Sequence, residues 1–176
     1  FTIPEGFTID DIAEKLEKEG ICTSEDFIKA INEYPLPTYI KANSEKRYNL
    51  EGFLFPDTYK FEKGILPEEI VKTLLNRFDE VWNEIVTNLG IKVNNDDIEK
   101  VITVASMVEK EARVDEERAT IASVIYNRDN KDMTLSIDAT VLYAYGYHKD
   151  KLYYKDLEIE SPYNTYLYKG LPIGPL

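Results

Sequence analysis

Two glutamates separated by one lysine, Glu109-Lys110-Glu111, carry carboxyl groups that are well placed in the sequence for proton transfer. They follow a helical pattern that begins near Asn95 and is apolar over most of its circumference, as in a helix buried inside a domain. A carboxyl group at the edge of such a helix is partly desolvated, which raises its pKa and suits it to act as a general acid near neutral pH. The pattern therefore indicates a helix-borne acid catalyst.

Helical geometry alone does not distinguish Glu109 from Glu111. At about 100° per residue, the two glutamates fall roughly 80° to either side of the centre of the apolar face. We take that centre from four residues, Val101, Ala105, Val108 and Ala112. The competing interpretation, a solvated helix end without a chemical role, is the commoner one for such a triplet.

Aromatic side chains gather late in the chain, where eight of the 13 tyrosines lie between Tyr143 and Tyr168. Tyrosine offers an apolar ring face and a polar tip, which suits a groove for sugar rings, although a protein core can use the same residues for bulk. This region also contains the segments Ser161–Tyr166 and Gly170–Pro175. Their glycines, prolines and short polar side chains are typical of an ordered functional loop or of a plain turn.

Charge and the rare residue types exclude several classes of function. The 176 residues include 21 Lys and Arg against 33 Asp and Glu, and the net charge of −12 disfavours nucleic acid and anionic lipid as partners. With one cysteine, Cys22, and one histidine, His148, the chain has no internal disulfide and no zinc site built from these residues, and a Ser-His-Asp triad is disfavoured. There is no run of 18 apolar residues and no nucleotide-binding glycine motif.

The elements that must position these residues fall into three parts. Residues 1–33 predict a short extended run and two helices, which are too few residues for an independent core. Residues 34–50, which include Pro35 and Pro37, predict a linker. Residues 51–176 predict a mainly helical body with short strands.

Within that body, a strand is expected from about Thr58 to Glu62. Four helices are expected to begin near Pro67, Asn95, Asp115 and Asp138, and to end near Gly90, Ala112, Arg128 and Gly146.

Five motifs taken together resemble one family of proteins. They are residues Gly52–Tyr59, Ala105–Glu111, Ile121–Arg128, Leu135–Tyr143 and Ser161–Pro175. In this order and at this spacing they resemble the YceG-like family, also called MltG, whose members are endolytic murein transglycosylases. The resemblance runs along nearly the whole chain.

The resemblance implies an α+β fold in which a small LysM-like βα module is joined to a mainly helical, lysozyme-like catalytic domain with short strands. Residues 1–33 then belong to the LysM-like module, 34–50 to the linker, and 51–176 to a catalytic domain that we expect to be truncated at its C-terminus. Members of the family also carry an N-terminal membrane anchor. We therefore expect the protein to act at the extracytoplasmic face of the bacterial cell membrane, held by a helix missing from this chain.

The resemblance also chooses between the two glutamates, because the catalytic residue of the family is the second glutamate of its motif, here Glu111. The later motifs imply six substrate-binding candidates: Ser136, Asp138, Tyr163, Asn164, Thr165 and Tyr166. Ser136 departs from the family pattern, since many members have glutamine at that position.

The implied reaction cleaves the bond between N-acetylmuramic acid and N-acetylglucosamine. Glu111 protonates the leaving oxygen, the 6-hydroxyl of the muramic acid attacks, and a 1,6-anhydro end results. Since no water is activated, the second carboxylate of most glycosidases is not required, and we expect neither a metal nor an organic cofactor. The expected partners are peptidoglycan glycan strands, with cell-wall synthesis proteins as further candidates.

Other functions stay open at this point. A non-catalytic peptidoglycan-binding module would hold glycan on its tyrosines without Glu111. A pyridoxal-phosphate-dependent aminodeoxychorismate lyase, a label that the family has sometimes carried, would need a Schiff-base lysine and a phosphate cup, and we identify neither in the sequence. A hydrolase would need a second carboxylate, for which Asp138 is the first candidate.

Overall fold

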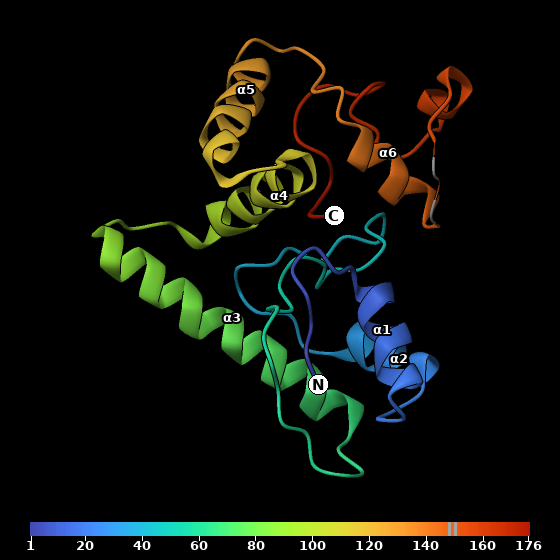
Figure 1. Cartoon of the computed structure of the whole chain (residues 1–176). Coiled ribbons are helices and arrows are strands. Elements are labelled where there is room, and N and C mark those ends of the chain that lie inside the picture. The colour runs from blue at the N-terminus through green and yellow to red at the C-terminus, as the bar shows by residue number, and fades with distance from the viewer. Residues whose placement is uncertain (148, 150) are drawn as a thin grey trace. The chain divides into compact units, whose positions relative to one another are not determined.

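The computed structural model describes residues 1–147, 149 and 151–176, so His148 lies outside the described residues. Within this part of the chain, six α-helices make up most of the regular structure (Figure 1). The mainly helical architecture predicted from the sequence is therefore confirmed.

The chain divides into two compact units, with boundaries inside the predicted linker and after Ile98. The first unit comprises Phe1–Ala42 and Arg47–Ile98, and the second comprises Asn43–Lys46 and Glu99–Leu176. Residues 1–33 thus pack together with later residues, as expected of a segment too short to bury a core of its own. Their assignment to a LysM-like module stays a prediction.

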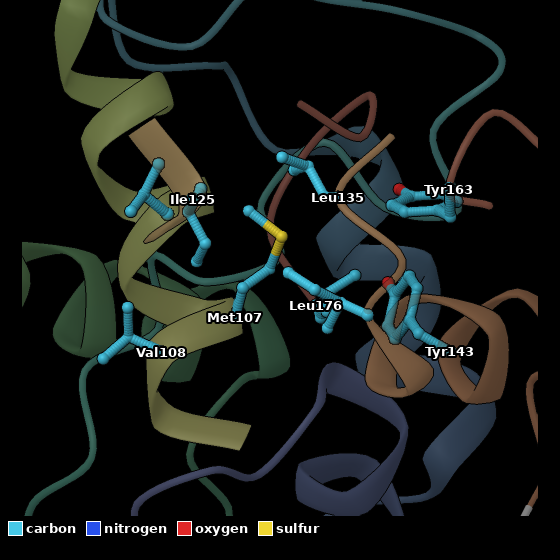
Figure 2. Close-up of a cluster of buried hydrophobic side chains, with 9 residues drawn as sticks. Met107, Val108, Ile125, Leu135, Tyr143, Tyr163 and Leu176 are labelled. Atoms are coloured by element: carbon cyan, nitrogen blue, oxygen red, sulfur yellow. The ribbon is translucent and has the colours of Figure 1, made fainter. Parts of the chain in front are cut away.

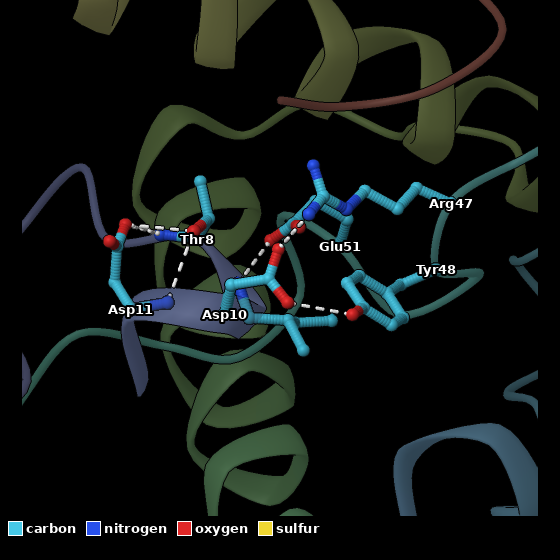
Figure 3. Close-up of polar contacts among 7 residues, drawn as sticks. Thr8, Asp10, Asp11, Arg47, Tyr48 and Glu51 are labelled. Carbon is cyan, nitrogen blue, oxygen red and sulfur yellow. Dashed lines mark hydrogen bonds and ion pairs between the residues drawn. The ribbon is translucent and has the colours of Figure 1, made fainter. Parts of the chain in front are cut away.

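Two capped helices open the first unit. α1 (Ile9–Lys18) begins after Thr8, whose hydroxyl accepts a hydrogen bond from the Asp11 amide while the Asp11 carboxylate accepts one from the Thr8 amide (Figure 3). α2 (Ser24–Glu33) begins in a similar way at Thr23. The two helices predicted within residues 1–33 are therefore confirmed. The buried residues of the two helices are Ile9, Ile12, Ala13 and Leu16 of α1 and Phe27, Ala30 and Ile31 of α2.

α3 (Pro67–Leu89) begins with a proline at its first position and ends at Gly90, whose left-handed backbone (φ 62°) favours glycine. Its bounds agree with the sequence. Only the first part of the helix is buried, because burial ends at Phe78 and Leu89 is 65% exposed.

Part of the predicted linker is tied to the start of α1 (Figure 3). The Asp10 carboxylate accepts a hydrogen bond from the Tyr48 hydroxyl at 2.7 Å and forms an ion pair with Arg47 at 2.5 Å. The Glu51 side chain, nearly fully buried, accepts a hydrogen bond from the Ile9 amide at 3.0 Å. Residues 47–50, at the end of the predicted linker, are therefore a folded part of the first unit.

The predicted strand from Thr58 to Glu62 is reduced to one antiparallel bridge between Thr2 and Thr58. Two backbone hydrogen bonds flank it, including one from the Tyr59 amide to the Phe1 carbonyl at 2.7 Å. This bridge is what the described residues contain of the expected short strands, and the α+β class, with its small βα module, stays a prediction.

The second unit contains most of α4 (Asn95–Glu111), all of α5 (Arg118–Asn130) and α6 (Asp138–Tyr145). Short 3-10 turns lie at Asp115–Glu117 and Tyr154–Glu158. The predicted helix starts at Pro67, Asn95 and Asp138 are thus confirmed, whereas the helix predicted from Asp115 begins three residues later, at Arg118.

A single cluster forms the core of the second unit, with Met107 of α4 fully buried within it (Figure 2). It draws on α4, α5, α6 and the coils that follow them. Its members are Val104, Met107, Val108, Ile125, Leu135, Ile137, Tyr143, Tyr163 and Leu176. None of the helices in the described residues combines the length and the hydropathy needed to cross a membrane.

Candidate active site

Burial along α4 separates the two candidate glutamates. Val104 and Met107 are buried, and Glu111 follows them by seven and four residues, so it continues the buried face at the end of the helix. Glu109 lies four residues after Ala105, which is exposed. The sequence had placed Ala105 at the centre of the apolar face. That placement is wrong, because the buried face is centred nearer to Met107.

The carboxyl group of Glu111 is accessible yet perturbed. Glu111 is exposed as a residue, so its carboxyl group can meet a ligand. Partial burial raises the pKa of this carboxyl group, and the negative charge of Asp138 raises it further. Both causes favour the protonated form, as a general acid requires.

Asp138, the first residue of α6, is paired with Tyr166. The Tyr166 hydroxyl donates a short hydrogen bond to a carboxylate oxygen of Asp138. Burial, the hydrogen bond to Asp138 and the charges of Asp138 and Glu111 raise the pKa of Tyr166 to about 12, against a smaller opposing effect of Arg128. Tyr166 therefore keeps its proton at neutral pH, and these side chains lie within electrostatic range of one another.

Thr165 fastens the loop that carries Tyr166 to the start of α6. Its hydroxyl accepts a hydrogen bond from the Ile137 amide at 3.0 Å and lies 2.9 Å from the Thr140 hydroxyl. Its carbonyl accepts from the Ser136 amide at 3.0 Å. Thr165 is 2% exposed, so its side chain supports the loop from inside the protein and does not face a ligand.

Asn164 is also an internal support. Its side-chain amide donates to the carbonyls of Leu157 at 2.9 Å and Ile159 at 2.8 Å, and its side-chain oxygen accepts from the Tyr166 amide at 2.9 Å. The residue is 1% exposed. All its side-chain hydrogen-bonding groups are therefore engaged inside the protein.

Tyr163 lies in the core of the second unit. Its ring meets that of Tyr143 edge to face, with centroids 4.8 Å apart (Figure 2). With 4% of its surface exposed, it packs the interior and offers no open ring face for a sugar.

Ser136 has a left-handed backbone, with φ of 54°, which is uncommon for a residue other than glycine. Its hydroxyl is 3.2 Å from that of Thr134. Such strained positions gather at functional sites, where surrounding contacts hold them. The hydrogen bond that the Ser136 amide donates to the Thr165 carbonyl stabilises this conformation.

Sequence reasoning did not select Arg128 as a functional residue. The guanidinium of Arg128, near the end of α5, donates a hydrogen bond to the Leu135 carbonyl and so supports the loop that leads to Ser136 and Asp138. Its positive charge also acts on Tyr166. The only signal in the sequence was its place at the end of a family motif, since a single arginine on a helix is usually solvated.

The predicted site residues thus separate into two groups. Glu111, Asp138 and Tyr166 come together at an accessible place, with Ser136 on the adjoining loop. Tyr163, Asn164 and Thr165 lie buried behind them. The arrangement can donate a proton from one carboxyl group beside a second carboxylate that is held by a tyrosine.

Comparison with known proteins extends over the whole chain. A model of the YceG-like family matches residues 1–176. A relative from Bacillus subtilis, named endolytic murein transglycosylase, is 36% identical over 99% of this chain and 51% of its own length. A relative of the same name from Streptococcus pneumoniae is 35% identical over 99% of this chain and 35% of its own length. The chain therefore spans about half or less of the length of these curated relatives.

A solved structure agrees with this match. The crystal structure of a protein described as YceG-like, from Listeria monocytogenes, superposes with a TM-score of 0.82 at 36% identity, covering 99% of this chain and 61% of that one. Since the family model and the relatives both cover nearly all residues, this chain belongs to the YceG-like family.

Proposed function

We propose that the protein containing this chain is an endolytic peptidoglycan lytic transglycosylase, with Glu111 as its acid/base catalyst. The names of the relatives from Bacillus subtilis and Streptococcus pneumoniae support the activity. The observation that carries it is the accessible carboxyl group of Glu111, whose pKa is raised by burial and by Asp138. A module that only binds glycan has no need of such a group.

In the proposed reaction, Glu111 first donates its proton to the glycosidic oxygen between N-acetylmuramic acid and N-acetylglucosamine. That bond breaks, and the electrons pass to the leaving oxygen. Glu111, now ionised, then takes the proton of the muramic acid 6-hydroxyl as that oxygen attacks the anomeric carbon. The result is a 1,6-anhydro end, without addition of water and without a cofactor.

We assign the neighbouring residues to two roles. Asp138 and Tyr166, with Ser136, line the space beside Glu111 and contact the sugar. The negative charge of Asp138 also favours the protonated form of Glu111. Tyr163, Asn164 and Thr165 act as positioning residues, which is consistent with their burial.

We also propose that the substrate is the glycan strand of peptidoglycan, met at the extracytoplasmic face of the membrane. The membrane anchor, the LysM-like module and protein partners in cell-wall synthesis belong to the same proposal. Residues 1–33 are the part of this chain that the proposal assigns to the LysM-like module.

The full-length enzyme should convert purified peptidoglycan strands into fragments that end in 1,6-anhydro-N-acetylmuramic acid. Mass spectrometry distinguishes these ends from reducing ends, which are heavier by about 18 Da because one water molecule has been added. Internal cuts should appear early, as a fall in mean strand length. Intact strands after prolonged incubation would contradict the proposed activity.

The pH dependence of the reaction should respond to Asp138. Because the charge of Asp138 raises the pKa of Glu111, Asp138→Asn should lower that pKa. Glu111 must be protonated to start the reaction, so the alkaline limb of kcat/KM should move to lower pH in the variant. Asp132→Asn, which changes an exposed aspartate of the same unit paired with Lys169, is the matched control. A limb that stays in place in Asp138→Asn would remove Asp138 from this role.

A further inference from the structure

A pocket of about 500 Å³ opens in the second unit, and neither Glu111 nor Asp138 belongs to its lining. Its volume is in the range of pockets that hold a small ligand, or one side chain of a larger ligand together with the adjoining groups of that ligand. Its walls combine apolar, aromatic and acidic groups. The lining residues that matter here are Glu45, Glu160, Pro162, Tyr168, Leu171 and Ile173.

The pocket selects for positive charge. Glu45 and Glu160 are exposed, and no described residue forms an ion pair or hydrogen bond with either carboxylate. No described lysine or arginine belongs to the lining. Two uncompensated carboxylates at one opening create a negative potential that attracts a cation.

The inner part of the pocket is apolar. Leu171 and Ile173 are partly buried and pack against the core cluster of the second unit. Tyr168, half exposed, adds an aromatic wall. A ligand that fits both parts carries a cationic group on a short aliphatic chain, because the chain can be buried while the charge stays at the acidic rim.

The pocket and the candidate active site share one loop. Tyr168 follows Tyr166 by two residues, so their Cα atoms are within about 7 Å of each other. Backbone hydrogen bonds from Tyr168 to Asn164 and from Ile173 to Pro162, both 3.2 Å long, hold the pocket walls to the same loop that presents Tyr166. The wall of the pocket at Tyr168 is therefore within reach of a large substrate that is bound at Tyr166.

We propose that this pocket binds the ammonium group of a diamino acid in the peptide stem of peptidoglycan, with the aliphatic part of that side chain against Leu171 and Ile173. The inference rests on the proposed function, since it deepens the substrate class. The site then recognises the peptide as well as the glycan, and favours strands whose stems keep a free amine.

The pocket can be tested by binding, without any turnover. Full-length protein is titrated with a soluble stem tripeptide that contains lysine, and with the same peptide acetylated on the lysine side-chain amine, by calorimetry. The free amine should bind more tightly by several fold, and Glu45→Gln with Glu160→Gln should remove most of that preference, about two- to fivefold for each charge. The preference should also weaken as salt is raised.

The control is Glu5→Gln with Glu84→Gln, which makes the same change in net charge at exposed glutamates of the first unit. It should leave the preference for the free amine unchanged. Equal binding of the two peptides by the wild-type protein, or an unchanged preference in the pocket variant, would overturn the inference.

Activity provides a second and separate reading. On strands that carry stems, the pocket variant should show a several-fold lower kcat/KM, whereas strands freed of peptide by an amidase should be cut at the wild-type rate. An equal loss on both substrates would also overturn the inference. Absence of anhydro ends from both substrates in the wild-type enzyme would instead overturn the proposed function, while the peptide titration would still test the pocket.

Discussion

Glu111→Gln should lower the rate of anhydro-end formation by about 10²–10⁴-fold, the usual contribution of general acid–base catalysis. The amide keeps the size of the side chain but has no proton to donate to the leaving oxygen. The assay is full-length enzyme on peptidoglycan strands, with anhydro ends counted by mass spectrometry. Glu109→Gln is the matched control, because Glu109 is exposed on the other side of α4 and should be much less sensitive.

The same substitution should leave the fold intact. The folded-state pKa of Glu111 lies above its unfolded value, so its stabilising effect is present at low pH and is lost as pH rises through the folded pKa. At neutral pH the variant should therefore melt at the same temperature as the wild type or slightly above it. Near wild-type turnover in Glu111→Gln would refute the assignment. Reducing ends in place of anhydro ends would identify a hydrolase, with Asp138 as the second carboxylate.

Asn164→Asp should reduce the free energy of unfolding by about 3–5 kcal/mol, the usual result of leaving a charge buried without a partner. The substitution keeps the shape of the side chain. It replaces the amide that donates to the Leu157 and Ile159 carbonyls with a carboxylate oxygen that faces them. Activity should fall as well, because Asn164 also holds the Tyr166 amide.

Urea denaturation followed by near-ultraviolet circular dichroism would measure the loss, with Asn83→Asp on the exposed surface of α3 as a control for the added charge. The control should change the stability by no more than about 0.5 kcal/mol. If Asn164→Asp instead weakened substrate binding while stability stayed at the wild-type value, Asn164 would be a ligand contact and not an internal support.

The helices were predictable because their signals are local. Thr8 with Asp11, Pro67, and glycines at positions 90 and 146 mark helix ends through backbone geometry that involves only neighbouring residues. The contacts that join residues 1–33 to later parts of the chain were not predictable in the same way. The hydrogen bond from Ile9 to Glu51 joins residues 42 positions apart, and no local residue pattern marks such a contact.

The catalytic candidate was predictable to within two residues. Periodicity placed both glutamates at the edge of the apolar face, but Ala105 is small enough to lie on either side, which shifted the estimated centre of that face. The burial of Met107 resolves the difference. Asn164 and Thr165 support the site by hydrogen bonds to residues that are distant in the sequence or to main-chain atoms. The types of the residues in the sequence do not reveal such partners.

Because Thr165 is attached directly to the start of α6, the geometry of the candidate active site does not depend on the length of the chain between them. Thr165 meets Ile137 and Thr140 directly, across 28 and 25 residues. Extra residues inserted between Gly146 and Tyr153 would add a loop-closure cost that grows only with the logarithm of length, about 0.6 kcal/mol for each doubling. They would leave the pairing of Tyr166 with Asp138 in place. An engineered insertion in this stretch should therefore leave the geometry around Glu111 unchanged.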